Sequence, residues 1–361
     1  MRLRKVRYEP VILGRRSASL FGASQGARDE RIAYPQTQAR RGFARFPWIF
    51  RSLYGMARRL RWVPEEGALV DVTCRTVQGR YLFRPSPELN EIALGVLGRA
   101  QRLYPIRICC LSVLSSHLHI LVDVDDARQL ADFMEYACSN LAREVGRLTD
   151  WEGPVFAGRY HAIIVSPEEQ AQVARLAYCL AQGCKENLVE RVRDWPGVHA
   201  AQALMDGEPL TGYWFDRSQE YRARRRGASF DPYRYATPET VHLSPLPCWK
   251  DLPDKIYQER VASLVQQIED EAAEERQRTG KPVLGVAAIL AQDPQYRPGF
   301  LDRSPAPLFL AASYSMWRTL YDAYAWFVAA FRDAAEKLRA GDRAAPFPRG
   351  SFPPALPFVG G

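Results

Sequence analysis

The chain has 361 residues, of which 47% are hydrophobic, and its formal net charge is +8 at pH 7. This hydrophobic content excludes an intrinsically disordered chain and leaves room for one large domain or a compact domain with extensions. The N-terminus lacks the apolar core of a signal peptide, and no apolar run reaches membrane-spanning length, so we expect a cytoplasmic protein that does not enter membranes.

Positive charge is concentrated at the N-terminus. Residues 1–61 contain 15 Lys or Arg against three acids, a net of +12, so the rest of the chain sums to about −4. Arginine interleaved with aromatic residues suits phosphate contact and base stacking; the alternative is a solvated, arginine-rich leader. We predict a basic arm over 1–61 that binds nucleic acid, and a second basic cluster further on; the cations are Arg58, Arg59, Arg61, Arg224, Arg225 and Arg226.

From Gly67 onward, hydrophobic periodicity predicts an alternation of strands and helices. The predicted strands cover 68–75, 106–114, 117–124 and 154–165, and the predicted helices cover 87–104, 127–148 and a segment that starts at a Ser166 cap. The order strand, helix, strand, strand, helix, strand, helix is that of a split βαβ, ferredoxin-like α+β fold with an antiparallel sheet.

Beyond residue 200 the periodicity is weaker. We expect a basic linker over 201–245 and a mostly helical extension over 246–361. Two helices of this extension are predicted to end at Gly280 and Gly341, and a Pro-rich tail follows. The domain between the arm and the linker therefore covers 62–200.

Two of the five histidines lie in one predicted strand, in the stretch "LSSHLHILVDV". Because side chains alternate along a strand, His117 and His119 share one face, while Leu118, Ile120 and Val122 form an apolar face on the other side. We expect the histidines to point away from the helix-packed core. Two imidazoles so placed can chelate one metal ion; the alternative is a partly exposed face with incidental histidines.

The helix that follows carries polar side chains beside its apolar stripe. On a helical wheel, Tyr178, Gln182, Arg175 and Lys185 fall away from the stripe. Tyr178 and Gln182 are four residues apart, so they are neighbours on a helix. A tyrosine becomes a useful nucleophile where a metal polarises the electrophile and cations offset the developing charge. Together with the histidines, this pattern indicates attack on a phosphodiester, and the alternative is a plain surface tyrosine.

These motifs resemble those of the single-tyrosine HUH transposases, and more closely the REP-associated tyrosine transposases. The family's His-hydrophobic-His motif is "HLH" here, and its tyrosine motif, "AYxxxNPVxxGLV…DWPG", stands as "AYCLAQGCKENLVERVRDWPG". The resemblance covers roughly Trp62 to Ala200. It implies a HUH nuclease core in which Tyr178 is the nucleophile and the metal ligands are His117, His119 and Gln182.

The resemblance also implies a substrate, a metal and a reaction. The substrate is single-stranded DNA at or near a REP-like hairpin, and the metal is Mg²⁺ or Mn²⁺; the histidines alone favour Zn²⁺ or Mn²⁺ as readily. Tyr178 attacks to give a 5′-phosphotyrosine link, which a second 3′ hydroxyl reverses, so that the enzyme acts as a DNA transposase. Arg175 and Lys185 are candidate phosphate contacts or plain solvated charges. A homodimer is compatible with this family, in which the tyrosine acts in its own subunit or in the partner's.

Some positions depart from the family's pattern. Ser116 replaces the usual Asn before the first histidine, and Gln182-Gly183 replaces Asn-Pro. The alternative function is therefore a non-catalytic or repurposed DNA-binding protein on the same fold. An amidohydrolase barrel, which also has His-x-His on a strand, needs an eightfold βα repeat that this pattern lacks. The metallo-β-lactamase pattern HxHxDH fails, because Leu121 and Val122 occupy its Asp and His positions.

Overall fold

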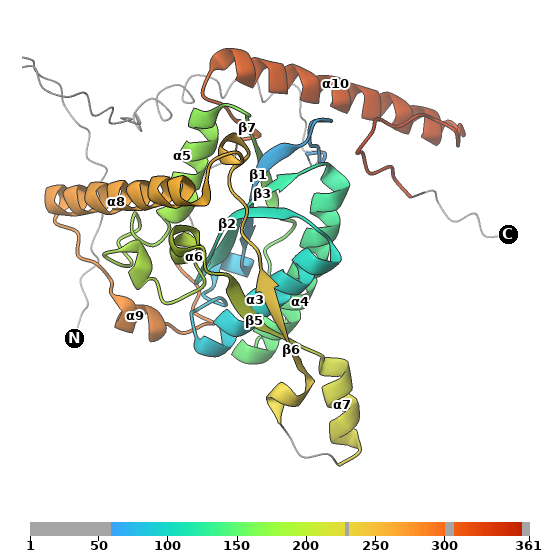
Figure 1. Ribbon diagram of the computed structural model, residues 1–361. Coiled ribbons are helices and arrows are strands. Elements are labelled where there is room, and N and C mark those ends of the chain that lie inside the picture. The colour runs from blue at the N-terminus through green and yellow to red at the C-terminus, as the bar shows by residue number, and fades with distance from the viewer. Residues whose placement is uncertain (1–58, 228–230, 300–306, 356–361) are drawn as a thin grey trace, which may run out of the picture. The chain divides into compact units, whose positions relative to one another are not determined.

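A five-stranded sheet lies at the centre of the computed structural model, which describes residues 59–227, 231–299 and 307–355 (Figure 1). The strands follow the order β2-β3-β1-β4-β7 and are β1 (Ala68–Arg75), β2 (Arg107–Leu114), β3 (His117–Val124), β4 (His161–Val165) and β7 (Phe309–Leu310). β1 pairs antiparallel with β3 and β4, and β2 pairs antiparallel with β3. β7 pairs parallel with β4, so the sheet is mixed rather than antiparallel as predicted, because the chain returns to this edge late in the sequence.

Helices α3 (Pro87–Leu103) and α4 (Ala127–Thr149) pack against each other on one face of the sheet. Both begin at a capping side chain, which satisfies N–H groups that the first turn leaves unpaired. The Ser86 hydroxyl accepts from the N–H of Leu89, and the Asp126 carboxylate accepts from the N–H groups of Arg128 and Gln129. This face is apolar, and its side chains from β3 are buried: Leu118, Ile120, Val122 and Val124.

Helix α5 (Glu169–Leu180) lies against the opposite face, which carries the two histidines. The histidines point away from the core that α3 and α4 cover, but α5 lies over their face, since α5 must bury its own stripe of Val173, Leu176 and Leu180. The predicted cap is wrong. The helix begins at Glu169, and the Ser166 hydroxyl donates instead to the Glu168 carboxylate at 2.7 Å.

Residues 201–245 are structured rather than the linker that the weak periodicity predicts. They contain α6 (Ala201–Asp206), β5 (Leu210–Phe215), α7 (Arg217–Arg225) and β6 (Ala236–Val241). β5 and β6 form an antiparallel hairpin that packs on α3, and α7 projects at the lower end of the view (Figure 1). The packing depends on glycine, because a Cβ at Gly95 would lie 2.1 Å from the backbone of Tyr213.

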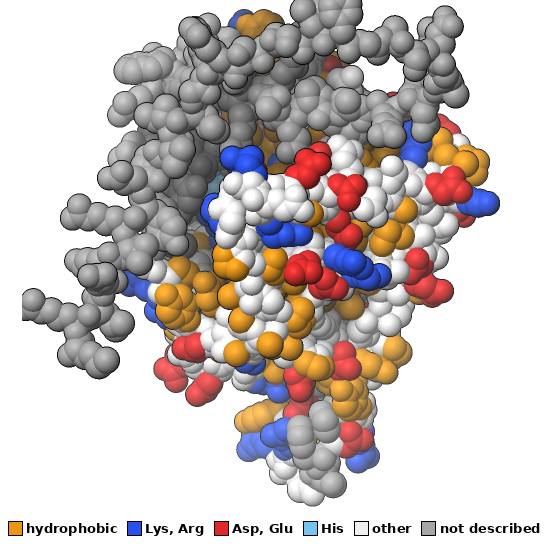
Figure 2. All heavy atoms as spheres, turned by 90° about the vertical axis from the view of Figure 1, so that its left-hand side faces the viewer, with side chains coloured by type: hydrophobic (Ala, Val, Ile, Leu, Met, Phe, Trp, Pro, Cys, Tyr) orange, Lys and Arg blue, Asp and Glu red, His pale blue; other side chains and the backbone are white. Residues whose placement is uncertain are grey.

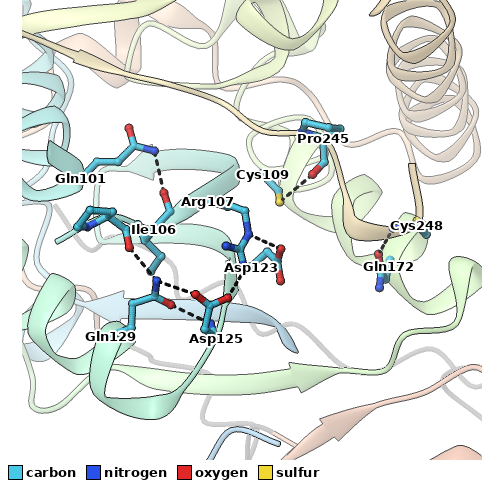
Figure 3. Close-up of polar contacts among 11 residues, drawn as sticks. Gln101, Ile106, Arg107, Cys109, Asp123, Asp125, Gln129, Gln172, Pro245 and Cys248 are labelled. Carbon is cyan, nitrogen blue, oxygen red and sulfur yellow. Dashed lines mark hydrogen bonds and ion pairs between the residues drawn. The ribbon is translucent and has the colours of Figure 1, made fainter. Parts of the chain in front are cut away.

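In the described ranges, the C-terminal part contains the helices α8 (Asp254–Thr279), α9 (Val286–Leu290) and α10 (Tyr314–Arg339). The connection from β6 to α8 runs along the edge of β2 and reaches α5 (Figure 3). The Cys109 thiol of β2 donates to the Pro245 carbonyl of this connection at 3.4 Å. The Cys248 N–H of the connection donates to the Gln172 side chain of α5 at 3.0 Å. Among the helices of the described ranges, none has the length and apolar character needed to cross a membrane.

Candidate active site

His117 and His119 lie side by side on β3, with their ring centroids 5.1 Å apart. A hydroxyl engages Nδ1 of each ring: Ser116 Oγ lies 3.1 Å from His117, and Thr73 Oγ1 lies 3.1 Å from His119. Such contacts fix the orientation of a ring and leave Nε2 as the atom that can bind a metal. Ser116, where the resemblance leads one to expect Asn, thus still supplies a polar partner to the first histidine.

Both imidazoles are neutral at physiological pH. Burial, with the nearby charges of His119, Arg75 and Lys185, lowers the pKa of His117 to about 3. Burial and the positive charge of Lys185 likewise lower the pKa of His119 to about 4. Since the neutral imidazole is the form that binds metal, the two rings are ready to act as ligands without losing a proton.

Gln182 lies two residues beyond the end of α5 and is only 1% exposed. Its side-chain amide donates to the Tyr178 carbonyl at 3.1 Å, and its side chain also forms a hydrogen bond with the His117 ring. Gly183 follows with a φ of 93°, a conformation that a side chain would strain. Glycine at the family's proline position therefore turns the chain after Gln182 and leaves Gln182 beside His117.

Tyr178 completes the group from the last turn of α5. Its side chain is 41% exposed, and its ring meets the His119 ring edge-on, with centroids 5.8 Å apart. Two cations lie over the phenol ring: Lys185 Nζ is 3.2 Å and Arg175 Cζ is 4.1 Å from the ring centroid. Positive charge at this distance stabilises negative charge that develops on the phenol oxygen.

Asp71 of β1 is a member of the site that the sequence analysis missed. The residue is fully buried, its Oδ1 lies 3.4 Å from His119 Nδ1, and its other oxygen accepts from the Arg175 guanidinium. Arg175, expected as a DNA contact, is therefore an internal ion-pair partner whose side chain is 11% exposed. The signal was a carboxylate in the middle of an apolar strand, because a buried carboxylate needs a partner.

Among the residues that the structure describes, two sets of donor atoms could hold a metal ion, and they share His119. The ligand atoms of Asp71, His119 and Cys179 lie within 4.8 Å of one another. Burial raises the pKa of the Cys179 thiol, and Asp71 is already paired with Arg175, so this set offers little free negative charge. The set of His117, His119 and Gln182 consists of neutral ligands, and imidazoles with an amide oxygen suit a divalent ion such as Mn²⁺. We judge the second set the better fit.

The other predicted cations are not all at this site. Arg58 lies outside the described residues. Arg59 is exposed, and its carbonyl accepts from Arg159 at 2.8 Å, whereas Arg61 lies over the rings of Tyr160 and Phe352. The cluster on and just after α7 belongs to the hairpin on α3, across the sheet from α5; it comprises Arg224, Arg225 and Arg226. Figure 2 shows basic side chains on both sides of this projecting lower end.

No family model and no curated protein matches the sequence. Among solved structures, a REP-associated tyrosine transposase bound to a REP hairpin is similar over 42% of this chain and 87% of its own, with 14% identity and a TM-score of 0.34. A candidate transposase from Deinococcus radiodurans is similar over 34% of this chain and 96% of its own, with 16% identity and a TM-score of 0.25. At these values neither structure assigns a family or an activity to this chain.

Proposed function

We propose that the chain is a DNA transposase that cuts and rejoins single-stranded DNA, at or beside a hairpin, through a 5′-phosphotyrosine link. The observation that carries the proposal is the meeting of four side chains from distant parts of the sequence. His117 and His119 come from β3, while Tyr178 and Gln182 come from the end of α5 and the turn after it. The element order, with α3 and α4 packed together on one face, also supports a split βαβ core.

The charges around the site favour a phosphodiester over an uncharged substrate. The candidate metal ligands are all neutral, and the positive charges of Lys185 and Arg75 act on them. The carboxylates nearby are already paired, Asp71 with Arg175 and Glu186 with Lys185. A divalent ion gains little from such surroundings until an anion enters. A phosphate supplies that charge, so we expect metal and DNA to strengthen each other's binding.

In the proposed reaction, Tyr178 is the nucleophile. Its phenol loses a proton to solvent while Lys185 and Arg175 offset the charge on the oxygen. The bond from this oxygen to phosphorus forms, the bond from phosphorus to the 3′ oxygen breaks, and the leaving 3′ oxygen takes up a proton. An ion such as Mg²⁺ or Mn²⁺, held by His117, His119 and Gln182, would polarise the scissile phosphate. Because the link conserves the ester, a second 3′ hydroxyl can reverse the step without ATP.

The test is the formation of a covalent adduct. Wild-type protein is incubated with labelled single-stranded hairpin DNA and Mn²⁺, and an adduct that survives SDS is measured on a gel. We expect the Tyr178→Phe variant to form none and EDTA to abolish the adduct. The matched control is Tyr221→Phe, because Tyr221 is 62% exposed on α7, across the sheet from the histidines.

Two results would contradict the proposal. An adduct that persists in Tyr178→Phe excludes this tyrosine as the nucleophile. Binding of DNA by the wild type without any adduct, in Mg²⁺ or Mn²⁺, indicates the alternative function, a non-catalytic DNA-binding protein on this fold. The His117→Ala, His119→Ala double variant distinguishes the two roles, since it should lose cleavage and keep salt-sensitive binding.

A further inference from the structure

The face of the sheet that carries the histidines continues past them to the β4 edge. In the register of the strands, Thr73 of β1 lies opposite His119 on one side and opposite His161 of β4 on the other. Arg75 of β1 lies opposite His117. Directly paired residues project to the same face, so His161 shares a face with the site. Two strand spacings separate it from His119, which is about 10 Å.

Positive charge gathers along this part of the face. Ala157 donates its N–H to the Arg75 carbonyl at 2.9 Å, so the chain that leads into β4 passes beside Arg75. Two residues later, the Arg159 guanidinium donates to the Arg59 carbonyl at 2.8 Å. We call Arg59, Arg75, Arg159 and His161 the β4-edge row. All four residues are exposed.

The charged residues of the row interact electrostatically with one another and with the site. Burial is the largest cause of the lowered pKa of His161, and the positive charges of Arg75, Arg59 and Arg159 lower it further. The charge of Arg75 also contributes to the lowered pKa of His117. Arg75 therefore lies between the candidate metal ligands and the rest of the row. The three arginines of the row therefore lie on the side of the site that faces β4.

We propose that the β4-edge row binds the phosphates of single-stranded DNA next to the phosphate that Tyr178 attacks. The three exposed arginines of the row suit a strand of phosphodiesters better than one small anion. The distance from His119 to His161, about 10 Å, leaves room beside the site for more than one phosphate of a strand. The identity of the attacked phosphate rests on the proposed function, whereas the binding by the row does not depend on cleavage.

The experiment measures binding alone. The Tyr178→Phe protein in EDTA is titrated into a fluorescent unstructured single-stranded oligonucleotide at several salt concentrations, and anisotropy gives the dissociation constant. We expect Arg75→Gln and Arg159→Gln, each alone, to reduce the slope of log affinity against log salt by about 0.7, the value for one phosphate of a single strand that is no longer neutralised. The matched control is Arg143→Gln, because Arg143 is exposed on α4 on the other side of the sheet.

Unchanged slopes in both variants, with melting temperatures like that of the parent, would overturn the proposal. An equal loss of slope on a blunt duplex would also overturn it, because the row would then bind duplex phosphates. The adduct assay distinguishes this proposal from the proposed function. If wild-type protein forms no adduct but the slopes fall as expected, the row binds DNA and the proposed transposase function is wrong. If an adduct forms and the slopes are unchanged, the proposed function is supported and the proposal for the row is wrong.

Discussion

The two faces of the central sheet are built by the same strands but serve different ends. On the side of α3 and α4, β3 presents buried aliphatic side chains, Leu118 and Ile120 among them. On the side of α5, alternate positions of β1 and β3 present two histidines, a carboxylate, a hydroxyl and an arginine. The first face is stabilised by burial of apolar area. On the second face each polar group depends on a particular partner, so the two faces should respond differently to substitution.

The largest expected effect lies on the apolar face. Leu118 stands between the two histidines in sequence, is 1% exposed and points to the other side of the sheet. Leu118→Ala should lower the free energy of unfolding by about 2–5 kcal/mol, because it leaves a cavity in the core. Denaturant titration measures the loss, and calorimetry should give an unchanged Mn²⁺ affinity for the folded variant. A metal affinity that falls tenfold would show that the two faces are not independent.

Asp71→Asn should lower both the stability of the protein and its metal affinity, through two different contacts on the polar face. The Arg175 charge loses its buried partner, which should cost about 3 kcal/mol of unfolding free energy. The His119 ring loses a carboxylate neighbour, and removal of such an outer partner typically lowers metal affinity about 10–100-fold. Denaturant titration and Mn²⁺ calorimetry measure these two effects separately.

A second substitution separates the two roles of Asp71. In the Asp71→Asn, Arg175→Gln double variant no buried charge of this pair is left without a partner, so stability should recover most of its loss. Metal affinity should stay low, because His119 still lacks the carboxylate. If metal affinity recovers together with stability, Asp71 acts only through the fold, and its contact with His119 does not contribute to metal binding.

Local patterns predicted much of this arrangement. Alternation along "HLHILVDV" was sufficient to separate the two faces of β3, since a strand fixes side-chain direction whatever it packs against. The helical wheel indicated that Tyr178 lies off the apolar stripe, and its side chain is 41% exposed. The wheel failed for Gln182, which is buried, because α5 ends at Leu180 and the chain beyond it is no longer helical.

What the sequence did not predict depends on contacts between distant residues. Asp71 and Arg175 are 104 residues apart, and neither position shows by itself that the other is its partner. The side of the sheet that α5 covers is likewise a matter of packing rather than of periodicity. The β5–β6 hairpin was missed because its short strands lie on α3, where Gly95 and Gly98 admit the hairpin's backbone. In the sequence alone, such glycines indicate only a less stable helix, because nothing shows which backbone packs against them.

Acid should weaken the polar face by protonating its histidines in the unfolded chain. His117 has a lowered pKa of about 3, and His119 and the half-buried His199 have lowered pKa values of about 4. The unfolded chain, with pKa values near 6.5, then binds more protons than the folded one. The stability from these groups is complete above about pH 6.5 and falls below it by about 1.4 kcal/mol per pH unit for each histidine.

The double variant His117→Gln, His119→Gln measures this contribution. Between about pH 6.5 and 4.5, its unfolding free energy should fall with pH less steeply than that of the wild type, by up to about 2.7 kcal/mol per pH unit for the two histidines removed. His161 and His199, whose pKa values are also lowered, keep the remaining slope. Denaturant titrations at several pH values give both slopes. Equal slopes would mean that the two rings are protonated as readily in the folded chain as in the unfolded one.

The smallest effect on the active site is expected from α7, which lies on the side of the apolar face. Arg225 and Arg226 are exposed at the end of this helix, away from the histidines. If the proposed function holds, we expect them to contact the duplex part of a hairpin. Replacing both with Gln should change stability by less than about 0.5 kcal/mol. With a hairpin, the slope of log affinity against log salt should fall by about 0.9 for each duplex phosphate that the variant no longer neutralises. With an unstructured single strand, both the affinity and the formation of the adduct should be unchanged. Slower formation of the adduct on the single strand would instead indicate that DNA contacts both faces of the sheet at once. The division of the sheet into a stabilising and a chemical face would then not extend to substrate binding.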